Sequence, residues 1–236
     1  MGKIYLLPNT LGDTELNSVI PQGVLEKIRS LTIFATENIK NTRRYLKKID
    51  RSIVIDELTF FELNEHTKPK DIETILVQLK NNDIGIISEA GCPGIADPGA
   101  ELVALAHKHN YEVTPLVGPS SILLALISSG FNGQSFSFNG YLPVKNNERH
   151  RAIKNYERQS LQENRTQIFI ETPYRNQKLL EEIIEILSPE AYLSIACDIT
   201  TENEYIKTMK IKEWRKLKIK PILHKRPAIF SIYFSN

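Results

Sequence analysis

Cysteine is scarce in this sequence of 236 residues, and so are the long apolar runs of a membrane protein. Cys92 and Cys197 are the only cysteines, and they form neither a metal-ligand spacing nor a disulfide framework, which suits a reducing compartment. No apolar run approaches the ~20 residues that a membrane helix requires. The N-terminus lacks a signal-peptide pattern. We therefore expect a cytoplasmic protein without a membrane segment.

Several motifs of common enzymes are also absent. The sequence contains no G-x-x-x-x-G-K-[ST] phosphate loop, no G-x-S-x-G nucleophile elbow and no H-E-x-x-H zinc motif. The five histidines show no metal-site spacing, so we expect no bound metal ion. These absences also give little support for a hydrolytic enzyme. Thirty basic against 28 acidic residues give a net charge of +2, which neither demonstrates nor excludes a nucleic-acid partner.

The most informative stretch is 84–99, Ile-Gly-Ile-Ile-Ser-Glu-Ala-Gly-Cys-Pro-Gly-Ile-Ala-Asp-Pro-Gly. Its apolar, β-branched beginning is typical of a buried strand. The glycines and prolines that follow predict a loop of defined shape with accessible backbone, because glycine tolerates close approach and proline fixes φ. Ligands of α/β sheets bind at the carboxyl ends of strands. The loop is therefore either an unusually long strand-to-helix connection or a ligand site.

Strands alternate with helices along the chain, which indicates βαβ units and two α/β domains. We expect a boundary near residue 118, giving domains 1–117 and 118–236. Two late segments, 204–211 and 228–234, alternate more clearly and are expected to be antiparallel strands at a sheet edge. The other expected strands are 3–7, 32–36, 52–55, 84–87, 112–117, 136–141, 166–171 and 192–197.

Polar residues follow many of these strands, and neighbouring parallel strands would bring them to one crevice. Each residue alone could instead cap a helix. Two groups of basic residues could form a phosphate-contacting rim or simply a solvated face. The basic residues are Lys40, Arg43, Arg44, Lys47 and Lys48, followed by Lys145, Arg149, Arg151 and Lys154; the run 207–225 is interpreted as surface.

Five ordered motifs resemble the tetrapyrrole methylase superfamily, and most closely its branch of small-subunit ribosomal RNA (cytidine-2′-O)-methyltransferases. Ser88–Gly99 is similar to the S-D-A-G-T-P-G-I-S-D-P-G pattern of that branch, differing at Glu89, Cys92 and Ala96. The other four motifs are Ala35–Arg43, Pro115–Ser121, Phe138–Arg149 and Phe169–Arg175.

The resemblance implies two α/β domains of the class III methyltransferase type, with a mostly parallel sheet in the first and a mixed sheet in the second. It also implies S-adenosyl-L-methionine in a cleft between the domains, and a homodimer. The implied cofactor contacts are Leu11, Ala90, Gly91, Cys92, Ile95, Ser120, Ser121, Glu171, Thr172, Pro227 and Ala228.

The implied reaction is 2′-O-methylation of a ribose in ribosomal RNA of the small subunit. Such a transfer requires alignment of the attacking oxygen and a base within hydrogen-bond reach. Glu37 is the candidate base, Lys145 and Arg149 are candidates for stabilising charge, and Arg43 and Arg175 are candidates for binding RNA phosphates.

Some residues depart from the branch pattern. Leu7–Asp13 replaces a segment that resembles A-T-P-I-G-N, and Lys40-Asn41 replaces an Arg-His pair. Two alternatives therefore stay open. One is a methyltransferase of a tetrapyrrole or another small molecule, and the other is a catalytically idle cofactor-binding module associated with the ribosome.

Overall fold

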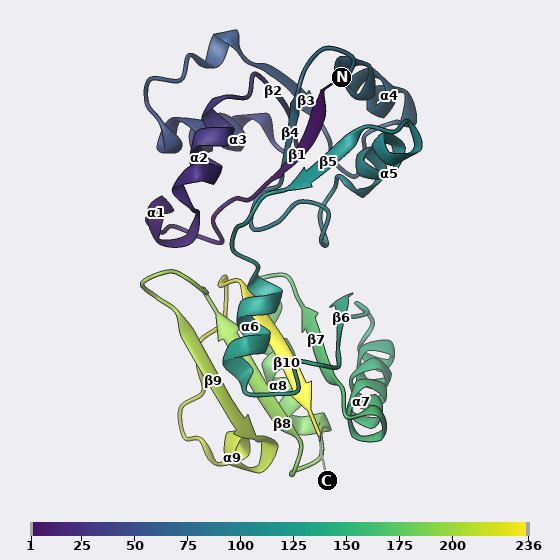
Figure 1. Cartoon of the computed structure of the whole chain (residues 1–236). Coiled ribbons are helices and arrows are strands. Elements are labelled where there is room, and N and C mark those ends of the chain that lie inside the picture. The colour runs from purple at the N-terminus through teal and green to yellow at the C-terminus, as the bar shows by residue number, and fades with distance from the viewer. Residues whose placement is uncertain (1, 235–236) are drawn as a thin grey trace. The chain divides into compact units, whose positions relative to one another are not determined.

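The computed structural model describes residues 2–234 and divides the chain into two compact units, Met1–Ser120 and Ser121–Asn236 (Figure 1). Each unit contains its own five-stranded sheet and its own hydrophobic core. The division falls between Ser120 and Ser121, whereas the sequence places it between residues 117 and 118. Two α/β domains, one with an all-parallel sheet and one with a mixed sheet, confirm the expected fold class.

The first sheet is entirely parallel, in the order β3-β2-β4-β1-β5. Its central strands are short and apolar, so both faces must be covered by helices. In register, Leu7 of β1 and Thr36 of β2 both pair with Ile87 of β4, which brings three strand ends to one edge of the sheet. The strands are β1 (Lys3–Leu7), β2 (Ile33–Thr36), β3 (Thr59–Glu62), β4 (Ile84–Ile87) and β5 (Glu112–Pro115).

Helices cover both faces of this sheet. Alternation along β2 directs Phe34 into one apolar cluster with α2 and α3, and Ile33 and Ala35 into the opposite cluster with α4 and α5. The helices of this unit are α1 (Leu16–Val19), α2 (Gln22–Arg29), α3 (Ile39–Ile49), α4 (Pro69–Gln78) and α5 (Ala100–Lys108), and a single 3₁₀ turn, η1, spans Ile55–Glu57.

The third strand was expected at 52–55, and that prediction is wrong. The strand lies at Thr59–Glu62, because Phe60 and Phe61 supply the apolar side chains that pack on the two faces at this edge. Residues 52–54 instead form the connection that leads into η1, and Val54 is half exposed.

The second sheet is mixed, in the order β6-β7-β10-β8-β9. Only β6 and β7 pair in parallel, and the other pairs are antiparallel. The strands are β6 (Phe136–Tyr141), β7 (Thr166–Ile170), β8 (Tyr192–Cys197), β9 (Tyr205–Lys210) and β10 (Ala228–Tyr233), and the helices are α6 (Ser121–Ser129), α7 (Asn146–Glu163), α8 (Asn176–Ile186) and α9 (Ile211–Lys216).

The last strand corrects a second expectation. The prediction that both late strands are antiparallel is confirmed, but β10 occupies the centre of the sheet between β7 and β8 rather than an edge. Residues 228–232 are buried for this reason. Of the two late strands, only β9 lies at an edge of the sheet. The basic run 207–225 is also not all surface, because Ile211 and Trp214 of α9 are fully buried.

No helix within residues 2–234 is long and apolar enough to cross a membrane.

Candidate active site

The loop that follows β4 is held against the residues that follow β1. Asn9 and Gly91 form an isolated antiparallel bridge, with the Asn9 N–H donating to the Gly91 carbonyl at 2.8 Å and the Gly91 N–H to the Asn9 carbonyl at 3.2 Å. The Asn9 side chain donates to the carbonyls of Ser88, at 3.1 Å, and Glu89, at 3.0 Å. A single asparagine therefore fixes the start of the loop.

The backbone conformation and the close neighbours of Gly91 both require glycine at this position. Its φ is +65°, and an added Cβ would lie 3.2 Å from Leu11 Cδ2 and 3.5 Å from the Pro119 carbonyl oxygen. Gly94 also has positive φ, and open space surrounds the position that its Cβ would occupy. The loop therefore presents exposed backbone at Gly94, whereas Gly91 itself is buried.

Carboxylates gather at the same edge of the first sheet. Burial, followed by the charge of Glu37, raises the pKa of Asp97 to about 6, and a hydrogen bond with Ser88 opposes the rise. Glu37 follows β2 and accepts a long hydrogen bond of 3.4 Å from the Glu89 N–H. Glu89 in turn accepts from the Asn41 amide at 2.5 Å. The region is therefore electronegative and suits a cationic ligand better than a phosphate.

Cys92 behaves as a small half-buried side chain and not as a nucleophile. Its Sγ lies 3.5 Å from the Pro119 carbonyl oxygen. Burial, helped by the charge of Asp97, raises the pKa of the Cys92 thiol, so the thiolate is disfavoured.

In the second unit, several of the predicted residues share one end of the sheet. Ile170 of β7 pairs with Ile229, and Ala228 pairs with Cys197 at the end of β8. The residues after β7 and β8 therefore lie beside those before β10. Glu171 is buried there and accepts hydrogen bonds from the Thr172 N–H, at 2.7 Å, and from the Arg175 guanidinium.

Three buried polar atoms at this end of the second sheet lack a hydrogen-bond partner among the described residues. They are Arg175 Nε, Asn176 Oδ1 and Thr200 Oγ1. Asn176 is fully buried at the start of α8, and its amide nitrogen donates to the Arg226 carbonyl at 2.6 Å. Thr200 follows β8 in the left-handed region, with φ +72°. Unmet polar atoms of this kind suit a polar ligand.

Arg149 is a buried structural residue in this geometry. All five of its N–H groups are engaged, two of them by Glu182 at 2.6 and 2.8 Å. The others donate to the carbonyls of Pro143 and Val144 and to the Asn146 side chain, at 2.6 to 3.2 Å. Arg149 therefore has no free donor for a phosphate. Its donors bind the residues on both sides of Lys145, so we expect Arg149 to position that segment rather than to stabilise charge directly.

The other predicted basic residues keep more freedom. Lys145 is exposed and its ammonium lies 3.2 Å from Glu148. Arg43 projects from α3 over the Phe60 ring, 5.2 Å from its centroid, and Arg175 is paired with Glu171. Lys40 and Arg44 are exposed, and among the described residues neither forms an ion pair.

The predicted cofactor residues divide between the two units. The structure brings Leu11, Gly91 and Cys92 around Pro119 in the first unit, and Glu171, Thr172, Pro227 and Ala228 to one end of the second sheet. Ala90 and Ile95 are exposed on the loop. Ser120 and Ser121 stand at the boundary, and both are half-buried.

Sequence reasoning missed Asn9 and Asp97. Asn9 acts through contacts about 80 residues away, which no local pattern reveals. Asp97 stands inside the quoted motif, but its altered pKa depends on burial and on Glu37. A separate groove of about 580 Å³ at the β3 edge contains none of the predicted cofactor residues; its lining includes Phe60, Phe61, Glu62, Asn64 and Thr67. Within residues 2–234, no group of His, Cys, Asp and Glu side chains is arranged to hold a metal ion.

The two-sheet fold and the strand-end loop together define a class of methyltransferase. The chain belongs to the tetrapyrrole methylase family, because the family model described as Tetrapyrrole (Corrin/Porphyrin) Methylases matches residues 3–214.

Among curated relatives, the chain is similar to the ribosomal RNA small subunit methyltransferase I of Synechocystis sp., with 33% identity over 205 residues. The alignment covers 86% of this chain and 69% of the relative. The protein of the same name from Escherichia coli O157:H7 is 31% identical over 206 residues, which cover 87% of this chain and 68% of the relative.

Two solved structures share the fold. The methyltransferase CobJ matches with a TM-score of 0.60 and 15% identity, covering 99% of both chains. Uroporphyrin-III C-methyltransferase from Thermus thermophilus, complexed with S-adenosylhomocysteine, matches with a TM-score of 0.53 and 14% identity, covering 98% of this chain and 97% of that chain.

Proposed function

We propose that this protein is an S-adenosylmethionine-dependent methyltransferase that methylates the 2′-hydroxyl of a ribose in small-subunit ribosomal RNA. The observation that carries the cofactor assignment is the loop 88–99, which Asn9 anchors at the buried Gly91 and whose backbone is exposed at Gly94. The RNA assignment rests on the curated relatives, which are named as methyltransferases of small-subunit ribosomal RNA.

The residues present fit S-adenosylmethionine. This molecule contains no phosphate, and the loop offers backbone groups next to carboxylates rather than a basic cradle. A cationic sulfonium is favoured near Glu37, Glu89 and Asp97. The unpartnered oxygens of Asn176 and Thr200 could serve its polar ends. Carried over from the motifs, the contacts would come from Leu11, Ala90, Gly91, Cys92, Ile95, Ser120, Ser121, Glu171, Thr172, Pro227 and Ala228.

When bound, the cofactor supplies an electrophilic methyl group. The residues of this chain would then hold the ribose oxygen in line with it, about 3 Å away, and exclude water. Glu37 is proposed as the base that accepts the hydroxyl proton at its carboxylate. Lys145 would stabilise charge from the segment that Arg149 fixes. Arg43 and Arg175 would contact RNA phosphates.

Substitution Gly91→Val tests the cofactor site. A β-branched side chain at φ +65° is strained and would approach Leu11 and the Pro119 carbonyl. We expect calorimetry to detect no S-adenosylmethionine binding, while circular dichroism shows that the sheets remain folded. Gly133→Val is the matched control, because nothing lies within 4 Å of its Cβ position and its φ is not positive. Unchanged affinity in Gly91→Val would refute the assignment.

Methyl transfer from labelled cofactor to small ribosomal subunits tests the substrate. The subunits should come from cells that lack this protein, and mapping should then locate the label on one ribose. Label in a small-molecule extract, with none in RNA, would favour a tetrapyrrole or other small substrate instead. Full activity of a folded Glu37→Gln variant would exclude Glu37 as the base.

We further propose that the protein is cytoplasmic, which its few cysteines favour, and that it forms a homodimer, as the resemblance implies. Sedimentation of the purified chain measures the second point directly.

A further inference from the structure

The segment that follows α9 has an unusual charge. Residues 215–226 include six lysines and arginines and no aspartate or glutamate. The arginine at each end is used by the fold. Arg215 donates to the carbonyls of Ile184, at 2.9 Å, and Leu187, at 2.8 Å. Arg226 donates to Asp198 at 2.6 Å. The four lysines between them remain.

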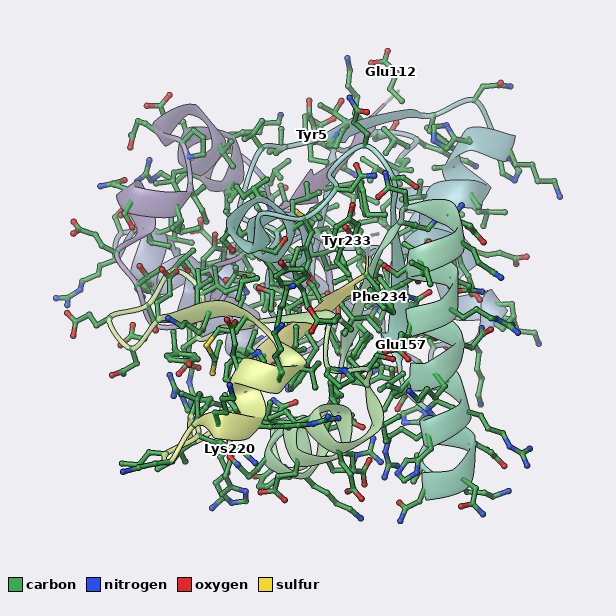
Figure 2. All side chains as sticks on the ribbon, turned by 90° about the horizontal axis from the view of Figure 1, so that it is seen from below. Tyr5, Glu112, Glu157, Lys220, Tyr233 and Phe234 are labelled. Carbon is green, nitrogen blue, oxygen red and sulfur yellow. The ribbon has the colours of Figure 1, made fainter. Side chains whose placement is uncertain are left out.

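These lysines are available to a partner. Lys216, Lys218 and Lys225 are exposed and Lys220 is half-buried, and none forms an ion pair within residues 2–234. Figure 2 labels Lys220 at the periphery of the second unit. Lys210 and Lys212 of the same unit, in contrast, both pair with Glu190.

The segment is also held in place. Leu223 is fully buried, and its N–H donates to the Gln177 side chain at 2.8 Å. The Lys225 N–H donates to the Pro173 carbonyl at 2.9 Å, and Asn176 donates to the Arg226 carbonyl at 2.6 Å. The positive surface is therefore ordered before any partner binds, which lowers the entropic cost of binding.

An exposed aromatic ring stands beside Lys225, the last of these cations. Tyr174 is 70% exposed although tyrosine is usually partly covered. The Lys225 ammonium lies 5.9 Å from the centroid of its ring, and the His224 ring contacts it edge-on at 6.2 Å. The ring is thus supported from the segment while most of its surface faces solvent.

We propose that Tyr174 and the lysines at 218, 220 and 225 bind a single-stranded segment of the substrate RNA. An ordered aromatic side chain among unpaired cations is the arrangement by which proteins bind single strands, with a base on the ring and phosphates at the cations. This inference rests on the proposed function, because it assigns the RNA part of that substrate to a surface outside the predicted site residues.

The test measures binding of a fluorescent oligouridine of about twelve nucleotides by anisotropy, at several salt concentrations, with the whole chain. Tyr174→Ala should weaken binding by about five-fold or more, because stacking contributes roughly that factor per base. Tyr174→Phe keeps the aromatic ring and should bind the oligouridine as tightly as the wild type. Changing Lys218, Lys220 and Lys225 together to glutamine should reduce the slope of log affinity against log salt by about 2, at about 0.7 per phosphate.

A matched control has the same change of charge in the first unit. Lys70, Lys80 and Lys108 are exposed, and none forms an ion pair within the described chain. Changing these three to glutamine should leave the salt slope unaltered, which would support the proposal. Equal effects of the two triple variants, or wild-type binding by Tyr174→Ala, would overturn it.

Three further outcomes distinguish this inference from the proposed function and from binding to a membrane. Methyl transfer to RNA by the wild type, with no loss of RNA affinity in any variant, would overturn this inference and leave the proposed function intact. Oligouridine binding that depends on these residues, with no methyl transfer to RNA, would support the surface and count against the proposed function. Lysine-dependent binding to phosphatidylserine vesicles without RNA binding would overturn the inference in favour of a membrane.

Discussion

Replacing Asp97 with asparagine should stabilise the first unit at neutral pH and leave its stability unchanged in acid. The pKa of Asp97 rises from 3.8 to about 6 in the folded chain, mainly through burial and then through the charge of Glu37. A raised carboxyl pKa means that the folded state prefers the protonated form. Ionisation of Asp97 therefore weakens the fold as the pH increases.

The magnitude follows from the same values. A rise of this size corresponds to about 3 kcal/mol once the group is ionised in both states. Because Asp97 retains some contact with water, we expect the Asn substitution to gain about 2 kcal/mol at pH 8. The gain should begin near pH 4, grow through pH 6 and then level off. Below pH 4 both states carry a protonated Asp97, so the two proteins should be equally stable.

Urea denaturation at pH 4, 5, 6, 7 and 8 checks this dependence. Circular dichroism follows both units, whereas fluorescence of Trp214, the single tryptophan, reports on the second unit. The gain must therefore be present in the dichroism transition. Glu37→Gln is a useful second variant, because removal of its charge should lower the pKa of Asp97 and reduce the gain. A stabilisation that is the same at pH 4 and pH 8 would refute the reasoning, since it would come from packing and not from charge.

Two other outcomes follow from the site and from the second unit. Binding of S-adenosylmethionine, which is cationic, should lower the pKa of Asp97 and release protons near pH 6, whereas binding of S-adenosylhomocysteine should release fewer protons. Calorimetry in buffers of different ionisation enthalpy measures the number of protons released. Equal release by the two ligands would contradict an acidic environment for the sulfonium. Arg149→Met should destabilise the second unit by about 3–5 kcal/mol, because Glu182 loses its buried partner. Trp214 fluorescence in urea measures this loss. Arg151 is exposed, so the control substitution Arg151→Met should change the free energy of unfolding by less than about 0.5 kcal/mol. Similar effects of the two substitutions would contradict a structural role for Arg149.

Much of the fold could be predicted because strands such as 84–87 are short and apolar, and a loop rich in glycine and proline follows this one. The failures have local causes. Residues 52–55 have the β-branched composition of a strand, and Ile53 and Ile55 do pack against the core, but the residues that pair with β2 are Thr59–Glu62. The central place of β10 depends on pairing with β7 and β8, and sequence alternation contains no information about such neighbours.

The candidate site also has a part that could be predicted from the sequence and a part that could not. The loop 88–99 could be found from its composition, because glycine and proline restrict the backbone directly. Arg149 could not be assigned correctly, because its partners Glu182 and Val144 come together only in the folded unit. The charge of a residue is visible in sequence, but whether that charge is already paired is a property of the tertiary structure.

The central position of β10 has a consequence for synthesis on the ribosome. This strand joins β6-β7 to β8-β9, and it is the last strand described. Until residues 228–233 have emerged, the two halves of the sheet each retain an unpaired edge at β7 and β8, which invites aggregation. At roughly 5–20 residues per second, a nascent chain spends several seconds between β8 and β10 in this state. The second unit therefore completes its core only after β10 has left the ribosome, and until then a chaperone could shield both edges.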